Sequence, residues 1–182
     1  MLHKSGHFMG KITQASRLLL YNQEELTHSE IQLKLADLSP SFYVLGKILK
    51  GSSFLDGLHW REFEELIADL LESDGYQVQL GPGTKDGGKD IIAMKELEGH
   101  GWFMSVWQAK KLRPGKKVEL SVIRELADTR QKQNASKGII VTSTYLTRGA
   151  LDRVTEDRFL LGKVDRDDLL QWIQRIKRRG IR

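Results

Sequence analysis

Cysteine is absent from all 182 residues of the chain. Its absence excludes disulfide bonds, zinc–thiolate sites and cysteine nucleophiles. The sequence also lacks an apolar run long enough to cross a bilayer, a signal-like N-terminal layout, low-complexity tracts and internal repeats. We therefore expect a cytoplasmic protein that has no membrane partner.

The composition favours a nucleic-acid partner. The formal net charge is +5 and the pI is about 9.4, and a basic excess of this kind suits a phosphate backbone. Basic residues gather in two places, at 110–117 and at 175–182. The second group has an equally good alternative interpretation as a solvated helix end whose cations complement the helix dipole.

Length and hydrophobic content (40%) fit one compact domain with a short appendage. We assign residues 1–53 to a helical N-terminal appendage. In it, Ser29 is expected to cap a helix that carries Ile31, Leu35 and Leu38 and ends at Pro40. Residues 54–182 then form the main domain.

The main domain alternates between helical and strand periodicity. In order, the pattern predicts a helix from 60 ending at Gly75, strands at 76–80, 90–94 and 102–109, a helix at 118–134, a strand at 138–142, a helix at 147–154 capped by Thr147, a strand at 159–164 and a last helix from 165. Residues 102–109 are apolar on both faces, so this strand should be central, with Trp102 and Trp107 in the core. An α/β fold follows, with a mixed central sheet flanked by helices.

Two polar motifs lie at the ends of neighbouring strands. Asp90 closes the motif DGGKD (86–90), and Gln108 and Lys110 end the strand that follows. Gln108 and Lys110 should share one face, because side chains alternate along a strand. Oxygen ligands from Asp90 and Gln108 suit Mg²⁺ or Mn²⁺, and Lys110 adds a positive charge for a phosphate. Each motif alone is commonplace, but together they indicate a metal-dependent phosphodiesterase.

Glu64 lies at the edge of the apolar stripe of the helix that starts at residue 60. A carboxylate at a core boundary needs a partner, since an unpaired buried charge is costly. Either a metal ion or Lys110 would supply one. The alternative is a side chain that simply reaches water.

From about residue 58 to 171, the chain resembles the Mrr-type restriction endonucleases, a branch of the PD-(D/E)xK nuclease superfamily. Several motifs in the same order carry this resemblance. They are Phe63-Glu64, Leu70-Leu71, Gly75-Tyr76, DGGKDI (86–91), Gln108-Ala109-Lys110, KGIIVTS (137–143) and Asp165 with Leu169-Leu170.

The resemblance implies a restriction-endonuclease-like core, Mg²⁺ dependence with Mn²⁺ able to substitute, and DNA cleavage. By position, Asp90 would be the metal-binding aspartate, Gln108 would replace the usual second acid and Lys110 would be the catalytic lysine. Glu64 would be the helix acid and a further metal ligand. DNA contacts are expected from Asp86, Lys111, Arg113, Lys116 and Lys117.

The leading expectation is a metal-dependent DNA endonuclease of restriction or genome defence. A junction-resolving or repair nuclease shares the same catalytic core and remains an alternative. A second alternative is a DNA-binding module that has lost catalysis. Cutting both strands with one site per chain predicts a homodimer.

Overall fold

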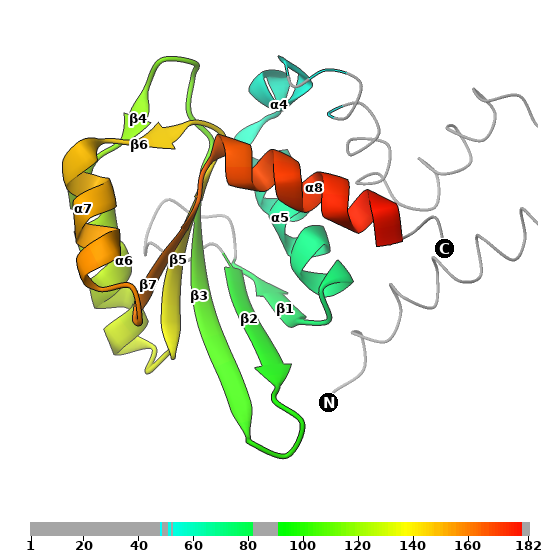
Figure 1. The fold of residues 1–182 in the computed structure, drawn as a ribbon, viewed down its shortest axis with the longest axis vertical. Coiled ribbons are helices and arrows are strands. Elements are labelled where there is room, and N and C mark those ends of the chain that lie inside the picture. The colour runs from blue at the N-terminus through cyan, green and yellow to red at the C-terminus, as the bar shows by residue number, and fades with distance from the viewer. Residues whose placement is uncertain (1–47, 49–50, 52, 82–90, 180–182) are drawn as a thin grey trace, which may run out of the picture.

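The computed structural model describes Ile48, Gly51 and residues 53–81 and 91–179 (Figure 1). The expected N-terminal helix and the two acids Asp86 and Asp90 lie outside the described residues. The proposed boundary at residues 53 and 54 therefore stays a prediction. The first described element is the short helix α4 (Ser53–Gly57).

Five strands form the central sheet, in the order β1-β2-β3-β5-β7. The strands are β1 (Gln77–Leu80), β2 (Ile91–Glu96), β3 (Trp102–Lys110), β5 (Lys137–Thr142) and β7 (Leu161–Val164). The first three strands are an antiparallel meander, and β5 and β7 continue the sheet in parallel with β3. The expected mixed sheet with a central third strand is thus confirmed.

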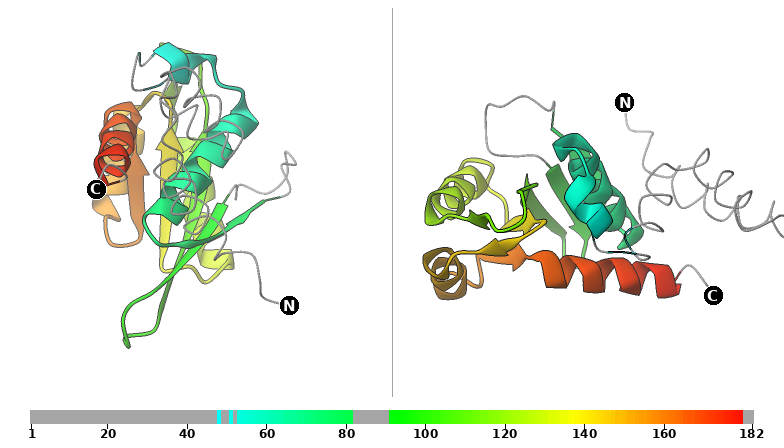
Figure 2. Two further views of the ribbon diagram at one scale, coloured as in Figure 1. Left: turned by 90° about the vertical axis from the view of Figure 1, so that its right-hand side faces the viewer. Right: turned by 90° about the horizontal axis from the view of Figure 1, so that it is seen from above.

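Helices cover both faces of the sheet (Figures 1 and 2). One face packs against α5 (Trp60–Ser73) and α8 (Arg166–Arg179), with Trp107 in that core cluster. The other packs against α6 (Leu120–Lys132) and α7 (Arg148–Glu156), with Val106 in its cluster. Adjacent residues of β3 therefore belong to opposite cores, as the pleat of a strand requires.

Local capping explains where the helices begin. Before α5, the His59 side chain accepts from the Arg61 amide (3.4 Å) and the Glu62 carboxylate accepts from the His59 amide (2.7 Å), which forms a capping box. The expected Thr147 cap of α7 is present, since its hydroxyl accepts from the Ala150 amide (3.4 Å). Gly75, at φ +85°, follows the C-cap of α5.

The expectation for Trp102 is wrong. Trp107 is only 6% exposed, as expected, but Trp102 is 56% exposed. The pairing of β3 with β5 begins at Ser105, so the first residues of β3 have only β2 beside them. This hairpin projects beyond the rest of the sheet (Figure 1).

Some elements had no sequence signal. Helix α4 and a small parallel sheet of β4 (Lys117–Val118) and β6 (Tyr145–Leu146) are too short to show a periodicity. The last strand also begins at Leu161 rather than at residue 159, because the two preceding residues belong to a turn. No helix in the described part of the chain is both long and apolar enough to span a membrane.

Candidate active site

Gln108 is the most unusual buried residue of the sheet. Its side chain is fully buried, yet neither its amide nitrogen nor its amide oxygen has a hydrogen-bond partner in the part of the chain that the structure describes. It shares the face of Val106, which is the face that α6 and α7 cover. Buried polar groups are nearly always paired with protein, water or a bound ligand, so this amide is a candidate binding group. Its oxygen is the hard donor that Mg²⁺ prefers.

Lys110, two residues further along β3, lies on the same face and is half-buried. It is the last residue of the strand and pairs in register with Thr142. Its carbonyl accepts from the Thr142 hydroxyl (2.8 Å) and from the Ser143 amide (3.3 Å). The backbone beneath the lysine is therefore fixed, while the side chain leaves the sheet at its rim.

Beyond Lys110, five residues form what we call the exit cluster: Asp56, Lys111, Leu112, Ser143 and Arg166. The Ser143 hydroxyl donates to the Leu112 carbonyl (3.1 Å) and accepts from the Leu112 amide (3.0 Å). The Arg166 guanidinium donates to both Asp56 carboxylate oxygens (2.6 and 3.0 Å) and to the Ser143 carbonyl (2.9 Å). Helices α4 and α8 and the end of β5 thus hold the chain where it leaves β3.

The exit cluster also contains one of the cations expected to contact DNA. The Lys111 ammonium donates to the Asp56 carbonyl (2.9 Å), so it is engaged within the protein. Arg113, Lys116 and Lys117, by contrast, are exposed around the turn that follows β3. These three are the members of the basic group that are presented to solvent beside Lys110.

Glu64 is 6% exposed, and one of its partners is a residue that was not predicted from the sequence. Its carboxylate accepts from the Arg61 guanidinium (2.8 Å), which also donates to the Gly81 carbonyl (3.3 Å). Gly81 follows β1 directly, at the end of the sheet where Ile91 pairs with Trp107. Glu64 therefore lies at the same end of the sheet as Gln108, but on the helix that covers the opposite face.

Asp90, the expected central ligand, lies outside the residues that the structure describes, and so does Asp86. Across the described ranges 53–81 and 91–179, no three His, Asp or Glu side chains gather as a metal site. Ile91, which is bonded to Asp90, pairs with Trp107, which is bonded to Gln108. The Asp56–Arg166 pair was not anticipated, since contacts between residues 110 positions apart leave no local pattern. The Arg61–Glu64 pair was missed although its i,i+3 spacing on one helix is a local signal.

A family model described as restriction endonuclease, for the Mrr catalytic domain, matches residues 55–173. The chain belongs to this restriction endonuclease family. A curated relative, the uncharacterized protein y4cE of Sinorhizobium fredii (strain NBRC 101917 / NGR234), is 30% identical over 129 residues, which are 70% of this chain and 32% of that protein.

Two solved restriction endonucleases share the fold. MspJI, in complex with a 27-mer oligonucleotide, matches with a TM-score of 0.51 and 17% identity. The match covers 85% of this chain and 35% of the MspJI chain. The DNA modification-dependent restriction endonuclease AspBHI matches with a TM-score of 0.53 and 16% identity. The match covers 79% of this chain and 39% of the AspBHI chain. The chain thus spans about a third of the length of these relatives, and it carries a nuclease domain of the restriction-endonuclease-like fold.

A second carboxylate of α5, Asp69, has an unusual pKa. Burial, together with the nearby carboxylates of Glu72 and Glu65, raises its pKa from 3.8 to about 7. The folded state therefore holds a proton that the unfolded state releases near pH 4, so stability should fall as pH rises from 4 to 7. Asp69→Asn is expected to increase the free energy of unfolding at pH 8 by about 2 kcal/mol and to leave it nearly unchanged at pH 4.

Urea unfolding at both pH values measures this difference. Asp128→Asn, an exposed aspartate of α6, is the matched control and should change stability little at either pH. An equal gain at pH 4 and pH 8 for Asp69→Asn would contradict the assignment, because it would not depend on the proton.

Proposed function

We propose that this domain is a metal-dependent DNA endonuclease that serves restriction or genome defence. The observation that carries the proposal is the orphaned amide of Gln108, which lies two residues before Lys110 on the central strand of a restriction-endonuclease-like fold. A buried amide without a partner is costly, and a structural role does not account for retaining it there. A bound cation would pair with the amide oxygen, and the amide nitrogen would donate to water or to a substrate oxygen beside it.

The residues have the following proposed roles. The Gln108 oxygen and the Asp90 carboxylate would hold Mg²⁺, or Mn²⁺ in its place. When bound there, such an ion would supply an acidified water molecule and positive charge beside the scissile phosphate. Lys110 orients the nucleophile and stabilises the transition state by its charge. The exit cluster keeps the Lys110 backbone in place while the side chain acts.

Two features support the ligand set. Ile91 pairs with Trp107 across β2 and β3. Asp90 is bonded to Ile91 and Gln108 is bonded to Trp107, so this pairing favours Asp90 as the neighbour of Gln108. Glu64 lies at the same end of the sheet, so we keep it as a third ligand, direct or through water. Its recruitment requires Arg61 to release the carboxylate, because a guanidinium and a cation compete for the same oxygens.

We further propose that residues 54–182 form the nuclease domain, that it works in the cytoplasm and that two copies pair to cut both strands. AspBHI acts in a modification-dependent way, so modified duplex belongs among the substrates tested. The decisive assay compares nicking of unmodified duplex, methylated duplex, branched and single-stranded DNA, each with Mg²⁺, with Mn²⁺ and with EDTA.

The assay separates the candidate functions. Cleavage of duplex DNA that EDTA abolishes supports the proposal, and a strong preference for methylated duplex would name its target. Preference for branched DNA would favour a junction-resolving nuclease. Binding without cleavage under every metal condition would overturn the proposal in favour of a binding module.

Gln108→Glu tests the metal ligand directly. An amide contributes an oxygen but no charge, so a carboxylate in its place should bind Mg²⁺ more tightly. It should also make folding depend on the metal, because an unpaired carboxylate is costly at a fully buried position. We expect Mg²⁺ to raise the Tm of Gln108→Glu more than that of the wild type.

Thermal unfolding over a Mg²⁺ titration measures both effects, and Gln79→Glu on the exposed side of β1 serves as the control. Unchanged or weaker Mg²⁺ binding by Gln108→Glu would count against Gln108 as a ligand. The result does not depend on whether the variant cleaves DNA.

A further inference from the structure

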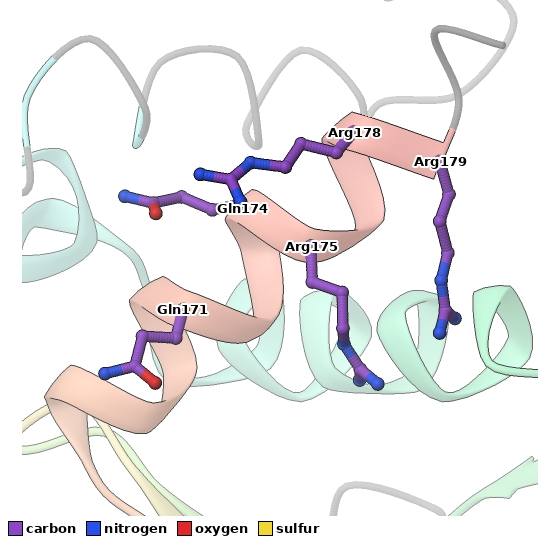
Figure 3. A pocket seen from close by; sticks show the side chains of 5 residues that line it. All are labelled: Gln171, Gln174, Arg175, Arg178 and Arg179. Atoms are coloured by element: carbon purple, nitrogen blue, oxygen red, sulfur yellow. The ribbon is translucent and has the colours of Figure 1, made fainter.

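The second half of α8 has a polar, basic face that the catalytic proposal does not use. Five residues from three successive turns line a hollow of about 570 Å³ there (Figure 3). They are Gln171, Gln174, Arg175, Arg178 and Arg179. All five side chains are exposed, and none is apolar. The lining therefore offers amide and guanidinium donors to whatever enters.

The charges on this face are not balanced. Arg175 and Arg179 both donate to the Asp74 carboxylate (2.5 and 2.7 Å), which also accepts from the Trp172 indole (2.8 Å). A single acid thus orients two arginines and cancels only one of their charges. In the described part of the chain, no acid pairs with Arg178, whose side chain points away from Arg175 and Arg179 (Figure 3). An excess of positive charge remains.

We propose that this face of α8 binds the phosphodiester backbone of DNA at a distance from the cleaved bond. The inference rests on the proposed nuclease function and adds where the substrate is held. Arginine and glutamine side chains are typical phosphate contacts that position a duplex without reading its sequence. The described residues of the lining include no aromatic ring for base stacking, so the backbone is the part of DNA that fits them.

The path of α8 supports this position. Arg166, in the first turn, donates to the Ser143 carbonyl beside the end of β3, so the helix starts next to Lys110. Arg178 follows twelve residues later, about 18 Å further along the helix axis. B-form DNA rises about 3.4 Å for each base pair, so this length corresponds to roughly five base pairs. Lys110 faces α6 and α7 whereas α8 covers the opposite face, so the duplex would have to cross the end of the sheet. A duplex that is cut there and then runs along α8 would meet Arg178 about half a turn away.

The helix dipole alone does not explain the arrangement. Cations at the last turn of α8 stabilise the helix, and this accounts for Lys177, Arg178 and Arg179. It does not account for Gln171 and Gln174, which extend the same face toward the middle of the helix and line the hollow. A DNA contact accounts for both groups.

The test uses Arg178→Gln and Arg178→Glu in the full chain. Binding of a fluorescent 30-base-pair duplex is measured without metal, at salt concentrations from about 50 to 200 mM. Arg178→Gln is expected to reduce the slope of log K against log salt by about one, and Arg178→Glu to weaken binding by roughly tenfold at the lowest salt. Arg124→Glu on α6, an equally exposed arginine on the other side of the sheet, is the matched control.

Cleavage by Arg178→Gln at saturating DNA should match the wild type, because the residue is far from the reacting bond. Salt slopes that are the same in Arg178→Gln and the wild type would overturn the inference, and so would an equal loss in Arg124→Glu. If the wild type and Arg178→Gln have equal salt slopes and both cleave DNA, only the α8 contact is refuted. If Arg178→Gln has the reduced slope but the wild type cleaves no DNA, only the nuclease function is refuted.

Discussion

Lys110→Ala is expected to lower the rate of DNA cleavage by about 100-fold or more while DNA binding without metal stays within about threefold of the wild type. The lysine is half-buried at the end of β3, on the face of Gln108, and its backbone is held by Thr142 and Ser143. Its loss removes a fixed positive charge from the reacting phosphate. Asp90→Ala should abolish cleavage in the same way.

Single-turnover cleavage and anisotropy-based binding on the same duplex separate the two effects. Lys116→Ala is the control, since this exposed lysine follows the same strand and lies away from the orphaned amide. It should reduce binding without changing the rate at saturating DNA. Unaltered turnover in Lys110→Ala would refute the catalytic assignment.

Gln108→Met is expected to stabilise the protein and to abolish cleavage. Methionine has nearly the volume of glutamine but no polar group, so the variant fills the same space without an orphaned amide. Removing an unsatisfied buried polar group should increase the free energy of unfolding by about 1–2 kcal/mol, or Tm by about 2–5 °C. A residue that weakens the fold yet is needed for activity is typical of a functional site.

Thermal unfolding with and without Mg²⁺, together with a cleavage assay, measures both halves of this prediction. Gln79→Met replaces the same residue type at an exposed position of β1 and should leave stability and cleavage unchanged. Lower stability of Gln108→Met would mean that the amide has a partner in the folded protein. Retained cleavage would exclude Gln108 as a ligand.

The order of the elements could be predicted because each has its own local signal. The apolar stripe of α5, the unbroken apolar run of β3 and the Thr147 cap of α7 each depend on a few neighbouring residues. The start of β3 depends instead on where β5 begins to pair with it. Exposure of Trp102 therefore follows from a contact between distant segments, which the run of residues around it does not encode.

Only part of the candidate site could be predicted from the sequence. Alternation along a strand puts Gln108 and Lys110 on one face, but it does not say which helices cover that face. The register and the two core clusters place them under α6 and α7, opposite to α5 and Glu64. The exit cluster depends on side chains that meet only in the folded chain, whereas the Arg61–Glu64 pair has a local i,i+3 spacing that could have predicted it.

The exit cluster has a consequence for the minimal functional fragment. Every recognisable motif of the domain lies after residue 58, yet Asp56 is the residue that ties Lys111 and Arg166 together. A fragment that starts at the first motif would keep every proposed catalytic side chain. It would lose the Asp56 contacts that hold the chain just after Lys110. The working unit therefore includes helix α4, which precedes its first recognisable motif.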